Sequence, residues 1–318
     1  SMLVVDQEYV ERLKKEQKRL PRISSLYGMD SIFKEIYKIP THIPIAQVCL
    51  LEHGANFQFS FFYERLLKSQ NELIFFDNSH RVKEYNKQTG KKSYPIGPLY
   101  PKYRKKKGYE PKNNRYGTLA FPSHSSSQFD FSTGYKRYAD DLKLLPVEFH
   151  PITICIYYYD ILQGHHKLFI DEGFNVITNG YIADPNFIDN LYEHLSSFKY
   201  ITSNHPGSYA FYALEMGIPF FLYGEGIDNQ LLSIGKMNGV NMSDFIQNDF
   251  LKKTSELMIF DVTKQITITE KLQLAINTIM DEHSILTPNQ VRALVMKNWV
   301  PLLLKKGISF LKQKLRRN

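Results

Sequence analysis

The chain has 318 residues, of which 43% are hydrophobic, so it can bury a sizeable core in one large or two small domains. The formal net charge is +8, and much of the excess lies in Lys91–Arg115 and the C-terminal tail. No apolar run approaches the roughly 18 residues of a membrane-spanning helix. The only two cysteines lie in apolar runs, which excludes a disulfide scaffold. Charged residues replace any secretory pattern near the N-terminus, so we expect a cytoplasmic protein.

The first part of the chain predicts strands that alternate with helices, followed by a basic connection. The expected elements are a helix over 4–20, a buried strand over 45–51, a helix over 57–68 and a strand over 72–76. Residues 88–115 break this pattern, because they contain four prolines, three glycines and many basic residues. We expect an exposed loop or an interdomain linker there.

A second alternating series follows and predicts a parallel sheet covered on both faces. The expected strands are 117–121, 152–158, 174–178, 198–202 and 219–223. The expected helices are 132–144, 160–171, 186–196, 207–216, 269–282, 288–298 and 300–316. The predicted fold class is therefore α/β, with two Rossmann-like domains built on parallel sheets and a C-terminal helical segment. The predicted divisions are an N-terminal α/β domain at 1–112, a second α/β domain at 113–300 and a basic amphipathic helix at 301–318.

The segment from Ser203 to Glu215 is the most specific candidate for a ligand site. A predicted strand ends at Ser203, and His205-Pro206-Gly207-Ser208 opens the next helix, where proline is favoured. Free N–H groups at a helix start and the hydroxyl of Ser208 suit a phosphate. Ligands of open α/β sheets bind beyond the carboxyl ends of the strands, which is where this loop lies. The alternative is an ordinary strand-to-helix crossover with a polar cap.

These residues resemble the donor-site motif of GT-B glycosyltransferases. The resemblance rests on Ser-x-x-x-Gly-Ser followed by Ala-Leu-Glu-Met-Gly-Ile-Pro-Phe-Phe, and it covers about residues 115–300. It implies that Gly207 and Ser208 contact the phosphates of a sugar nucleotide and that Glu215 contacts the ribose. The region 113–150 departs from the commonest form of the family, because it lacks a clear Arg/Lys pair for the diphosphate.

A second resemblance, to bacterial sialyltransferases and related enzymes that use CMP-sugars, rests on three short motifs. The chain contains Asp171-Glu172-Gly173, the pairs His150-Pro151 and His205-Pro206, and Ser125-Ser126-Ser127. Each motif has an ordinary structural reading beside the functional one, such as a glycine that ends a helix at Gly173.

Three other turns at predicted strand ends contain candidate site residues. His53 lies in a His-Gly turn after the first buried strand, and its imidazole could act as a general base that deprotonates an acceptor hydroxyl. Asp77, after the next strand, is the alternative candidate for this base. Ser123, His124 and Ser125 follow the strand 117–121 and provide hydroxyl and imidazole donors for a phosphate or a sugar. The alternative for each is a polar turn or a helix cap.

Together these features predict a glycosyltransferase that moves a sugar from a nucleotide-activated donor, such as a CMP- or UDP-sugar, to a glycan or glycolipid acceptor of capsule, O-antigen or lipooligosaccharide. Because no Asp-x-Asp-type motif is convincing, we expect metal-independent chemistry. We also expect base-assisted direct displacement with inversion, and no cofactor. One alternative is a nucleotide-sugar epimerase or hydrolase on the same scaffold. Another is a basic protein that binds lipid or nucleic acid, although no nucleic-acid motif is recognised and nucleic acid is not an expected partner.

The tail Leu302–Asn318 combines six leucines and isoleucines with six lysines and arginines. Such a basic amphipathic segment suits an anionic membrane surface, so peripheral attachment to the inner face of the plasma membrane is one interpretation. The alternative is a terminal helix that packs on the body of the protein and exposes a solvated basic face.

Overall fold

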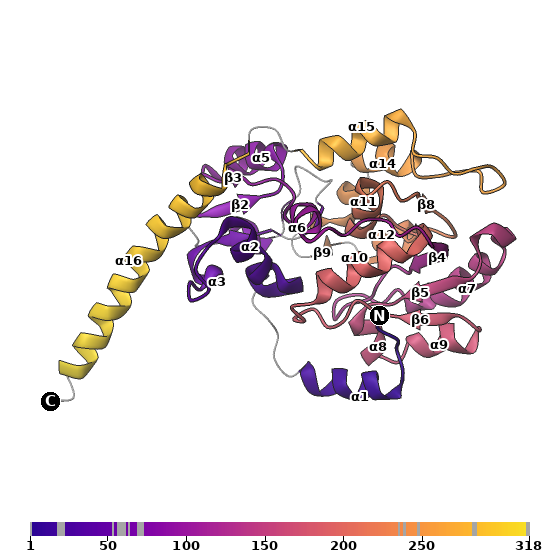
Figure 1. Ribbon diagram of the computed structural model, residues 1–318, viewed down its shortest axis with the longest axis horizontal. Coiled ribbons are helices and arrows are strands. Elements are labelled where there is room, and N and C mark those ends of the chain that lie inside the picture. The colour runs from indigo at the N-terminus through magenta and orange to yellow at the C-terminus, as the bar shows by residue number, and fades with distance from the viewer. Residues whose placement is uncertain are drawn as a thin grey trace.

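The computed structural model describes residues 2–17, 23–52, 54–55, 62, 64–68, 73–234, 236–237, 240–246, 249–281 and 285–315. It is an α/β fold with one three-stranded and one five-stranded sheet, both entirely parallel (Figure 1). The predicted fold class, with two parallel sheets and a C-terminal helix, is therefore confirmed.

The smaller sheet has the order β1-β2-β3. Its part of the chain contains η1 (Ile23–Gly28), α2 (Met29–Tyr37), α3 (Ile45–Val48), β1 (Leu50–Leu51), α4 (Glu64–Leu67), β2 (Ile74–Phe76), α5 (Ser79–Thr89), β3 (Tyr94–Pro95) and α6 (Leu99–Lys107). Asn78 caps the start of α5, since its side-chain oxygen accepts the N–H of His80 at 2.8 Å. These elements surround a short sheet in which β1 and β2 are buried and β3 is half-buried.

The larger sheet has the order β6-β5-β4-β7-β8. Its part of the chain contains β4 (Tyr116–Phe121), η2 (Ser132–Gly134), α7 (Tyr135–Lys143), η3 (Val147–Phe149), β5 (Ile152–Cys155), α8 (Tyr158–Leu162), α9 (His166–Asp171), β6 (Asn175–Ile177), α10 (Phe187–Ser197), β7 (Phe198–Ser203), α11 (Ser208–Glu215) and β8 (Phe220–Leu222). All five strands fall within two residues of the positions that the sequence predicted, apart from the C-terminal end of β5.

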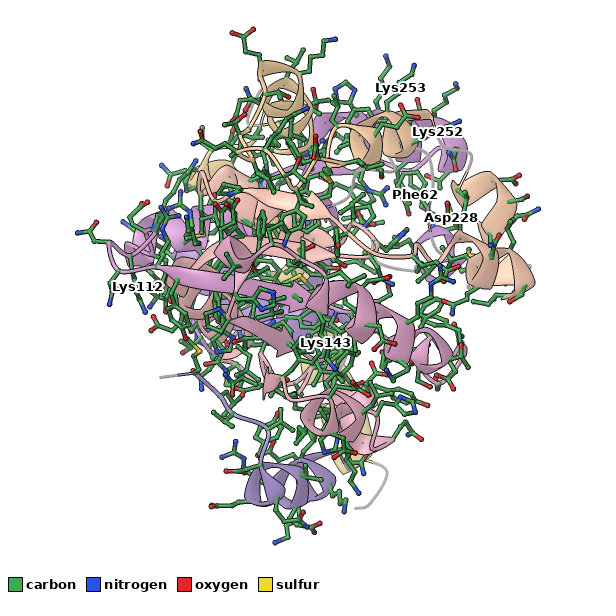
Figure 2. All side chains as sticks on the ribbon, turned by 90° about the vertical axis from the view of Figure 1, so that its right-hand side faces the viewer. Phe62, Lys112, Lys143, Asp228, Lys252 and Lys253 are labelled. Atoms are coloured by element: carbon green, nitrogen blue, oxygen red, sulfur yellow. The ribbon has the colours of Figure 1, made fainter. Side chains whose placement is uncertain are left out.

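Both faces of the five-stranded sheet are buried. Successive side chains of a strand point to opposite faces, so each strand contributes side chains to two cores. Leu119 and Phe121 of β4 belong to the core that also contains α10 and α11, whereas Ala120 belongs to the core that contains α7 and α9. The first core continues into α2 and α6, so the two halves of the molecule share one apolar interior. Charged side chains such as Lys252 and Lys253 project from the surface around these layers (Figure 2).

The N-terminal stretch lies with the larger sheet, although the predicted first domain, 1–112, includes it. The N–H of Val5 donates to the carbonyl of Val176 and the N–H of Thr178 donates to Leu3, each at 3.0 Å, beside β6. Helix α1 (Gln7–Glu16) follows, with Asp6 as its cap. The domain boundaries at 112 and 300 themselves stay predictions.

The predicted buried strand at 45–51 is only partly correct. The structure has the short helix α3 at its start, after Pro44, and a strand of only two residues, Leu50–Leu51. A continuous apolar run reports burial but not whether a buried segment is helical or extended. Proline suits the start of a helix because its missing N–H has no partner there in any case.

The predicted exposed loop or linker at 88–115 is wrong. The segment contains β3, which pairs with β2, and helix α6, whose Leu99, Tyr100 and Tyr103 are buried in the shared core. Three of the four prolines, Pro95, Pro98 and Pro101, lie in or before the first turn of α6, where proline is tolerated, and Pro111 follows the helix. The lysines lie in the last turn, where cations stabilise a helix, and Gly108 ends it in the left-handed conformation.

The C-terminal part contains α12 (Asp228–Ile234), β9 (Lys236–Met237), β10 (Val240–Asn241), α13 (Met242–Ile246), α14 (Asp249–Glu256), α15 (Glu270–Ile279) and α16 (Pro288–Leu315). The last is one helix through Pro301, where the sequence predicted two. Its first half packs against α2 and α3, with Trp299 beside His42, and its second half extends away from the body (Figure 1). Across the described residues, no helix combines the length and apolarity that a membrane crossing needs.

Candidate functional site

The five-stranded sheet has one position where its chain order reverses, between β4 and β7. The chain leaves β4 toward β5 and β6 on one side, and returns to β7 and β8 on the other. At such a reversal the connecting loops turn away from each other and leave a crevice outside the carboxyl ends of the strands. The loops that border it are 122–131, after β4, and 204–207, after β7. Seven of the predicted site residues lie at these strand ends: Ser123, His124, Ser125, Ser203, His205, Gly207 and Ser208.

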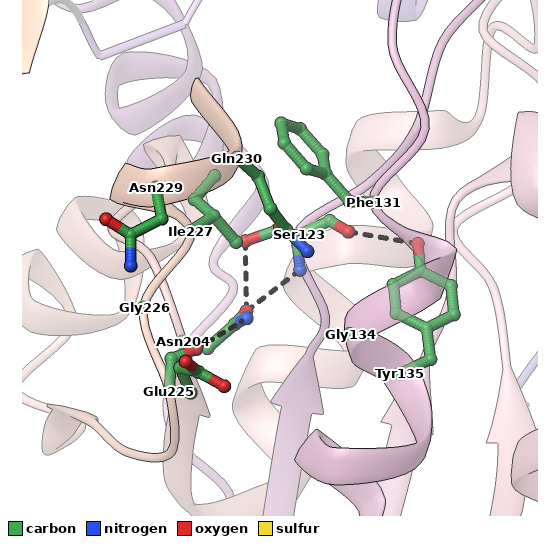
Figure 3. Close-up of a pocket in the computed structure, with 10 residues that line it drawn as sticks. All are labelled: Ser123, Phe131, Gly134, Tyr135, Asn204, Glu225, Gly226, Ile227, Asn229 and Gln230. Atoms are coloured by element: carbon green, nitrogen blue, oxygen red, sulfur yellow. Dashed lines mark hydrogen bonds between the residues drawn. The ribbon is translucent and has the colours of Figure 1, made fainter. Parts of the chain in front are cut away.

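Asn204 ties the two loops together. Its side-chain oxygen accepts both the N–H of Ser123 at 3.0 Å and the Ser123 hydroxyl at 2.9 Å, and its amide nitrogen donates to the carbonyl of Glu225 at 3.2 Å (Figure 3). A pocket opens beside this junction, lined by Ser123, Phe131, Gly134, Tyr135, Asn204, Glu225, Gly226, Ile227, Asn229 and Gln230 (Figure 3). Asn204 was not among the predicted site residues, although it stands inside the Ser203–Ser208 motif.

Each of the two loops that border the crevice contains one histidine, His124 and His205. The ring of His124 lies 4.2 Å from that of Tyr157, and its Nδ1 is 3.3 Å from the carbonyl of Ser125. Desolvation lowers the pKa of His205 to about 4 and also lowers that of His124. His124 is open to solvent on one side, but the surrounding protein still disfavours its charged form. Both imidazoles are therefore neutral at pH 7, a form that donates a hydrogen bond from one nitrogen and accepts at the other.

Ser203 shapes the loop after β7 from within. Its hydroxyl lies 2.6 Å from the carbonyl of Phe121 and 2.8 Å from that of His205, and it accepts the N–H of His205 at 3.2 Å. The side chain is fully buried. Tyr209 completes the arrangement, since its hydroxyl is 2.7 Å from Ser203 and its ring stacks on Phe121 at 4.2 Å. These contacts fix the start of α11 over the end of β4.

Ser208 and Glu215 lie two turns apart on α11 and both point toward the smaller half of the molecule. The Ser208 hydroxyl accepts the N–H of Ala55 at 3.0 Å. The Glu215 carboxylate accepts the Nε and one Nη of Arg104, at 2.9 and 2.8 Å. The sequence placed Arg104 in the basic linker and gave no sign of this ion pair. The two predicted ligand contacts stay predictions, and Glu215 already has a bidentate cation.

The loop after β1 comes very close to the start of α11 at Gly54. This residue has φ +90°, a backbone conformation that side chains strongly disfavour, and a Cβ there would lie 2.7 Å from the Ser208 hydroxyl oxygen. The carboxyl edge of the smaller sheet therefore touches the carboxyl edge of the larger one at this point.

Substituting Gly54 tests how closely these two edges must approach. Gly54→Ala adds both backbone strain and a steric clash, and we expect it to lower the free energy of unfolding by about 1–3 kcal/mol. Gly54→Ala/Ser208→Ala removes the clashing oxygen and should recover only part of the loss, because the φ strain persists. Urea unfolding measures both effects. Equal stability of Gly54→Ala and the native chain would contradict the close approach.

Asp77 follows β2 at the carboxyl edge of the smaller sheet and is 7% exposed. Burial raises its pKa well above the ordinary value, and the nearby Glu52 carboxylate raises it further against the opposing charges of Arg81 and Lys102. Burial and the Glu52 carboxylate therefore both favour the protonated form of Asp77. The rival base, His53, lies outside the described residues, between Glu52 at the end of β1 and Gly54.

The motifs of the CMP-sugar resemblance do not come together. His150-Pro151 immediately precedes β5 and Asp171-Glu172-Gly173 precedes β6, so both lie at the amino edge of the parallel sheet. Glu172 is paired there with Lys143 and Lys136. Only His205-Pro206 and Ser125-Ser126-Ser127 lie at the carboxyl edge. In the portion of the chain described, no group of three or more His, Cys, Asp or Glu side chains gathers as a metal site requires.

No family model matches the chain. No curated protein matches it in sequence. Among solved structures, it is similar to a wall teichoic acid polymerase, TagF, with 11% identity and a TM-score of 0.34 over 73% of this chain and 59% of that chain. It is similar to a UDP-GlcNAc 2-epimerase from Neisseria meningitidis, with 13% identity and a TM-score of 0.35 over 91% and 84%. It is also similar to the lipopolysaccharide outer core galactosyltransferase WaaB, with 12% identity and a TM-score of 0.29 over 76% and 77%.

Proposed function

We propose that the chain is a glycosyltransferase that moves a sugar from a nucleotide-activated donor to a glycan or glycolipid acceptor of the bacterial surface. The observation that carries the proposal is the contact between Gly54-Ala55 and Ser208. It joins the carboxyl edges of two parallel sheets, and each such edge is where an α/β sheet binds a ligand. A donor on the larger sheet and an acceptor on the smaller one would then meet between them.

The donor phosphates would lie at the loops after β4 and β7. Departure of the nucleotide leaves negative charge on a phosphate oxygen, and fixed hydrogen-bond donors lower the barrier by stabilising that charge. The neutral imidazoles of His124 and His205 and the first N–H groups of α11, after Gly207, supply such donors. Ser203 acts by holding the loop. No step in this scheme requires a metal or a cofactor.

A nucleotide-binding experiment tests the proposal. We expect one of CMP, UDP, GDP and dTDP to raise the melting temperature of the native chain. His205→Ala should weaken binding of that nucleotide by about 10- to 100-fold, the worth of a hydrogen bond to a charged group. The matched control is His150→Ala, which removes an exposed histidine at the opposite edge of the same sheet and should leave the affinity unchanged.

Two outcomes would contradict the proposal. One is that no nucleotide stabilises the native chain or binds to it by calorimetry. The other is release of free sugar at the same rate with and without any glycan acceptor, which would indicate a hydrolase instead of a transferase.

We propose that α16 attaches the protein to an anionic membrane surface. The helix extends beyond α2 and α3 with its basic C-terminal sequence at the far end (Figure 1). Deletion of Lys312–Asn318 should reduce sedimentation with vesicles that contain an anionic lipid, and 0.5 M salt should mimic the deletion by screening the lysines and arginines. Equal sedimentation of the full-length and truncated chains would contradict membrane attachment and would mean that α16 only packs against the body of the protein.

A further inference from the structure

A fully buried carboxylate lies behind the loop that follows β4. Asp160, in the first turn of α8 at the carboxyl end of β5, has no exposed surface. One of its oxygens accepts the backbone N–H of Ser125 at 3.1 Å, and the other lies 3.0 Å from Nδ1 of His165. A carboxylate cannot donate, so His165 must hold its proton on Nδ1 in this contact. Neither residue stood out in the sequence.

The contact to Ser125 connects Asp160 to both functional loops. The carbonyl of Ser125, in the following peptide, lies 3.3 Å from Nδ1 of His124. Next to it, Ser123 donates to Asn204 in the loop after β7, and Tyr135 donates to the Ser123 carbonyl at 2.9 Å. Moving the peptide that joins His124 to Ser125 would therefore move the histidine and the serine that border the crevice.

Burying a charged carboxylate costs free energy, whereas leaving it in water does not. The hydrogen bonds that Asp160 accepts must therefore offset this cost. An apolar residue at position 160 would pack in the same place without that cost, but it would leave the Ser125 N–H without an acceptor. The Ser125 hydroxyl is already used inside the loop, where it accepts the N–H of Phe131 at 2.9 Å and lies 3.2 Å from Asp130.

We propose that Asp160 is a positioning residue of the donor site, which holds Ser123 and His124 at the crevice through the backbone of Ser125. The proposal rests on the donor site of the proposed function. His165 satisfies the second carboxylate oxygen and takes no part in the reaction.

Two variants of Asp160 separate its role as an acceptor from its charge. Asp160→Ala removes the acceptor of the Ser125 N–H. Asp160→Asn keeps an oxygen for that N–H and presents its NH₂ group to His165, which can accept it on Nδ1 by moving its own proton to Nε2. Asp261→Ala is the matched control, since Asp261 also accepts a backbone N–H, that of Thr263 at 3.1 Å, but at an exposed turn.

Hydrogen exchange of the full chain without ligand gives the first readout. We expect the amides of 123–131 to exchange at least tenfold faster in Asp160→Ala, and within threefold of the native rate in Asp160→Asn and Asp261→Ala. Exchange in α10 should stay unchanged in all three. Native exchange of the loop in Asp160→Ala would overturn the proposal, as would an acceleration spread evenly over the whole domain.

Nucleotide affinity gives the second readout, with the nucleotide that stabilises the native chain. Asp160→Ala should lose about tenfold or more in affinity, and Asp160→Asn should stay within threefold. Rescue by asparagine is what distinguishes positioning through the acceptor from a general effect of a lost charge. Equal losses in both variants would overturn the proposal. If the native chain binds no nucleotide, the proposed function fails, while the exchange experiment still decides whether Asp160 holds the loop.

Discussion

His53→Ala is expected to lower turnover by about 10²–10⁴-fold, the usual worth of positioned acid–base catalysis, while nucleotide affinity stays within threefold. His53 directly follows Glu52, which lies at the carboxyl end of β1, on the half of the molecule that would receive the acceptor. A base acts on the acceptor hydroxyl, whereas the nucleotide lies on the other sheet. Initial rates at saturating donor, together with calorimetry on the same variant, separate the two effects.

Asp77→Asn is the control, because Asp77 is the rival base at the end of β2. Burial and the neighbouring Glu52 keep the pKa of Asp77 well above its ordinary value. The protonated form that these neighbours favour cannot accept a proton, so we expect the asparagine variant to keep turnover within about tenfold of the native rate. If turnover instead collapses in Asp77→Asn and survives in His53→Ala, the base is Asp77. Loss of nucleotide binding in His53→Ala would place His53 in the donor site.

The larger sheet could be predicted from the sequence because its strands are buried on both faces. Such strands are short apolar runs separated by helices of similar length, as at 117–121 and 198–202, and the alternation itself implies parallel pairing. The position of the candidate loops followed from the same pattern. Once Ser203 was placed at the end of a strand, His205 and Gly207 had to lie at the carboxyl edge.

The smaller half could not be predicted in the same way, because tertiary packing decides its structure. The composition of residues 88–115 favours a solvated loop. The free energy gained by burying Tyr100 and Tyr103 against α10 and α11 exceeds the free energy that the prolines cost. The apolar run at 45–51 contains no periodicity that distinguishes a helical turn from a strand.

The contacts that the site side chains make could also not be predicted from the sequence. Ser208 and Glu215 were expected on one face of α11, and a helical spacing of seven residues makes that prediction sound. The sequence did not show that this face is covered by Ala55 and Arg104. Asp160 and Asn204 were missed for a related reason, since each acts through a backbone or side chain of a distant loop.

Arg81→Met is expected to lower the free energy of unfolding by about 3–5 kcal/mol, the usual cost of leaving one charge of a buried pair without its partner. Arg81 is 2% exposed, and its Nε donates to the Glu52 carboxylate at 2.6 Å while one Nη contacts the other oxygen. Its guanidinium also lies 4.3 Å from the centre of the Phe62 ring. Urea unfolding of Arg81→Met against the native chain measures the loss.

Two further variants identify the cause of that loss. The double variant Glu52→Leu/Arg81→Met replaces both charges with apolar groups and should recover most of the stability, because the buried charge of Glu52 is removed together with its partner. Arg137→Met breaks the exposed pair with Glu225, whose side chains are 67% and 52% exposed, and should change stability by less than about 1 kcal/mol. If the double variant is as unstable as Arg81→Met alone, the loss comes from the packing of Arg81 against Phe62 and Phe76, and the interpretation as an uncompensated charge is wrong.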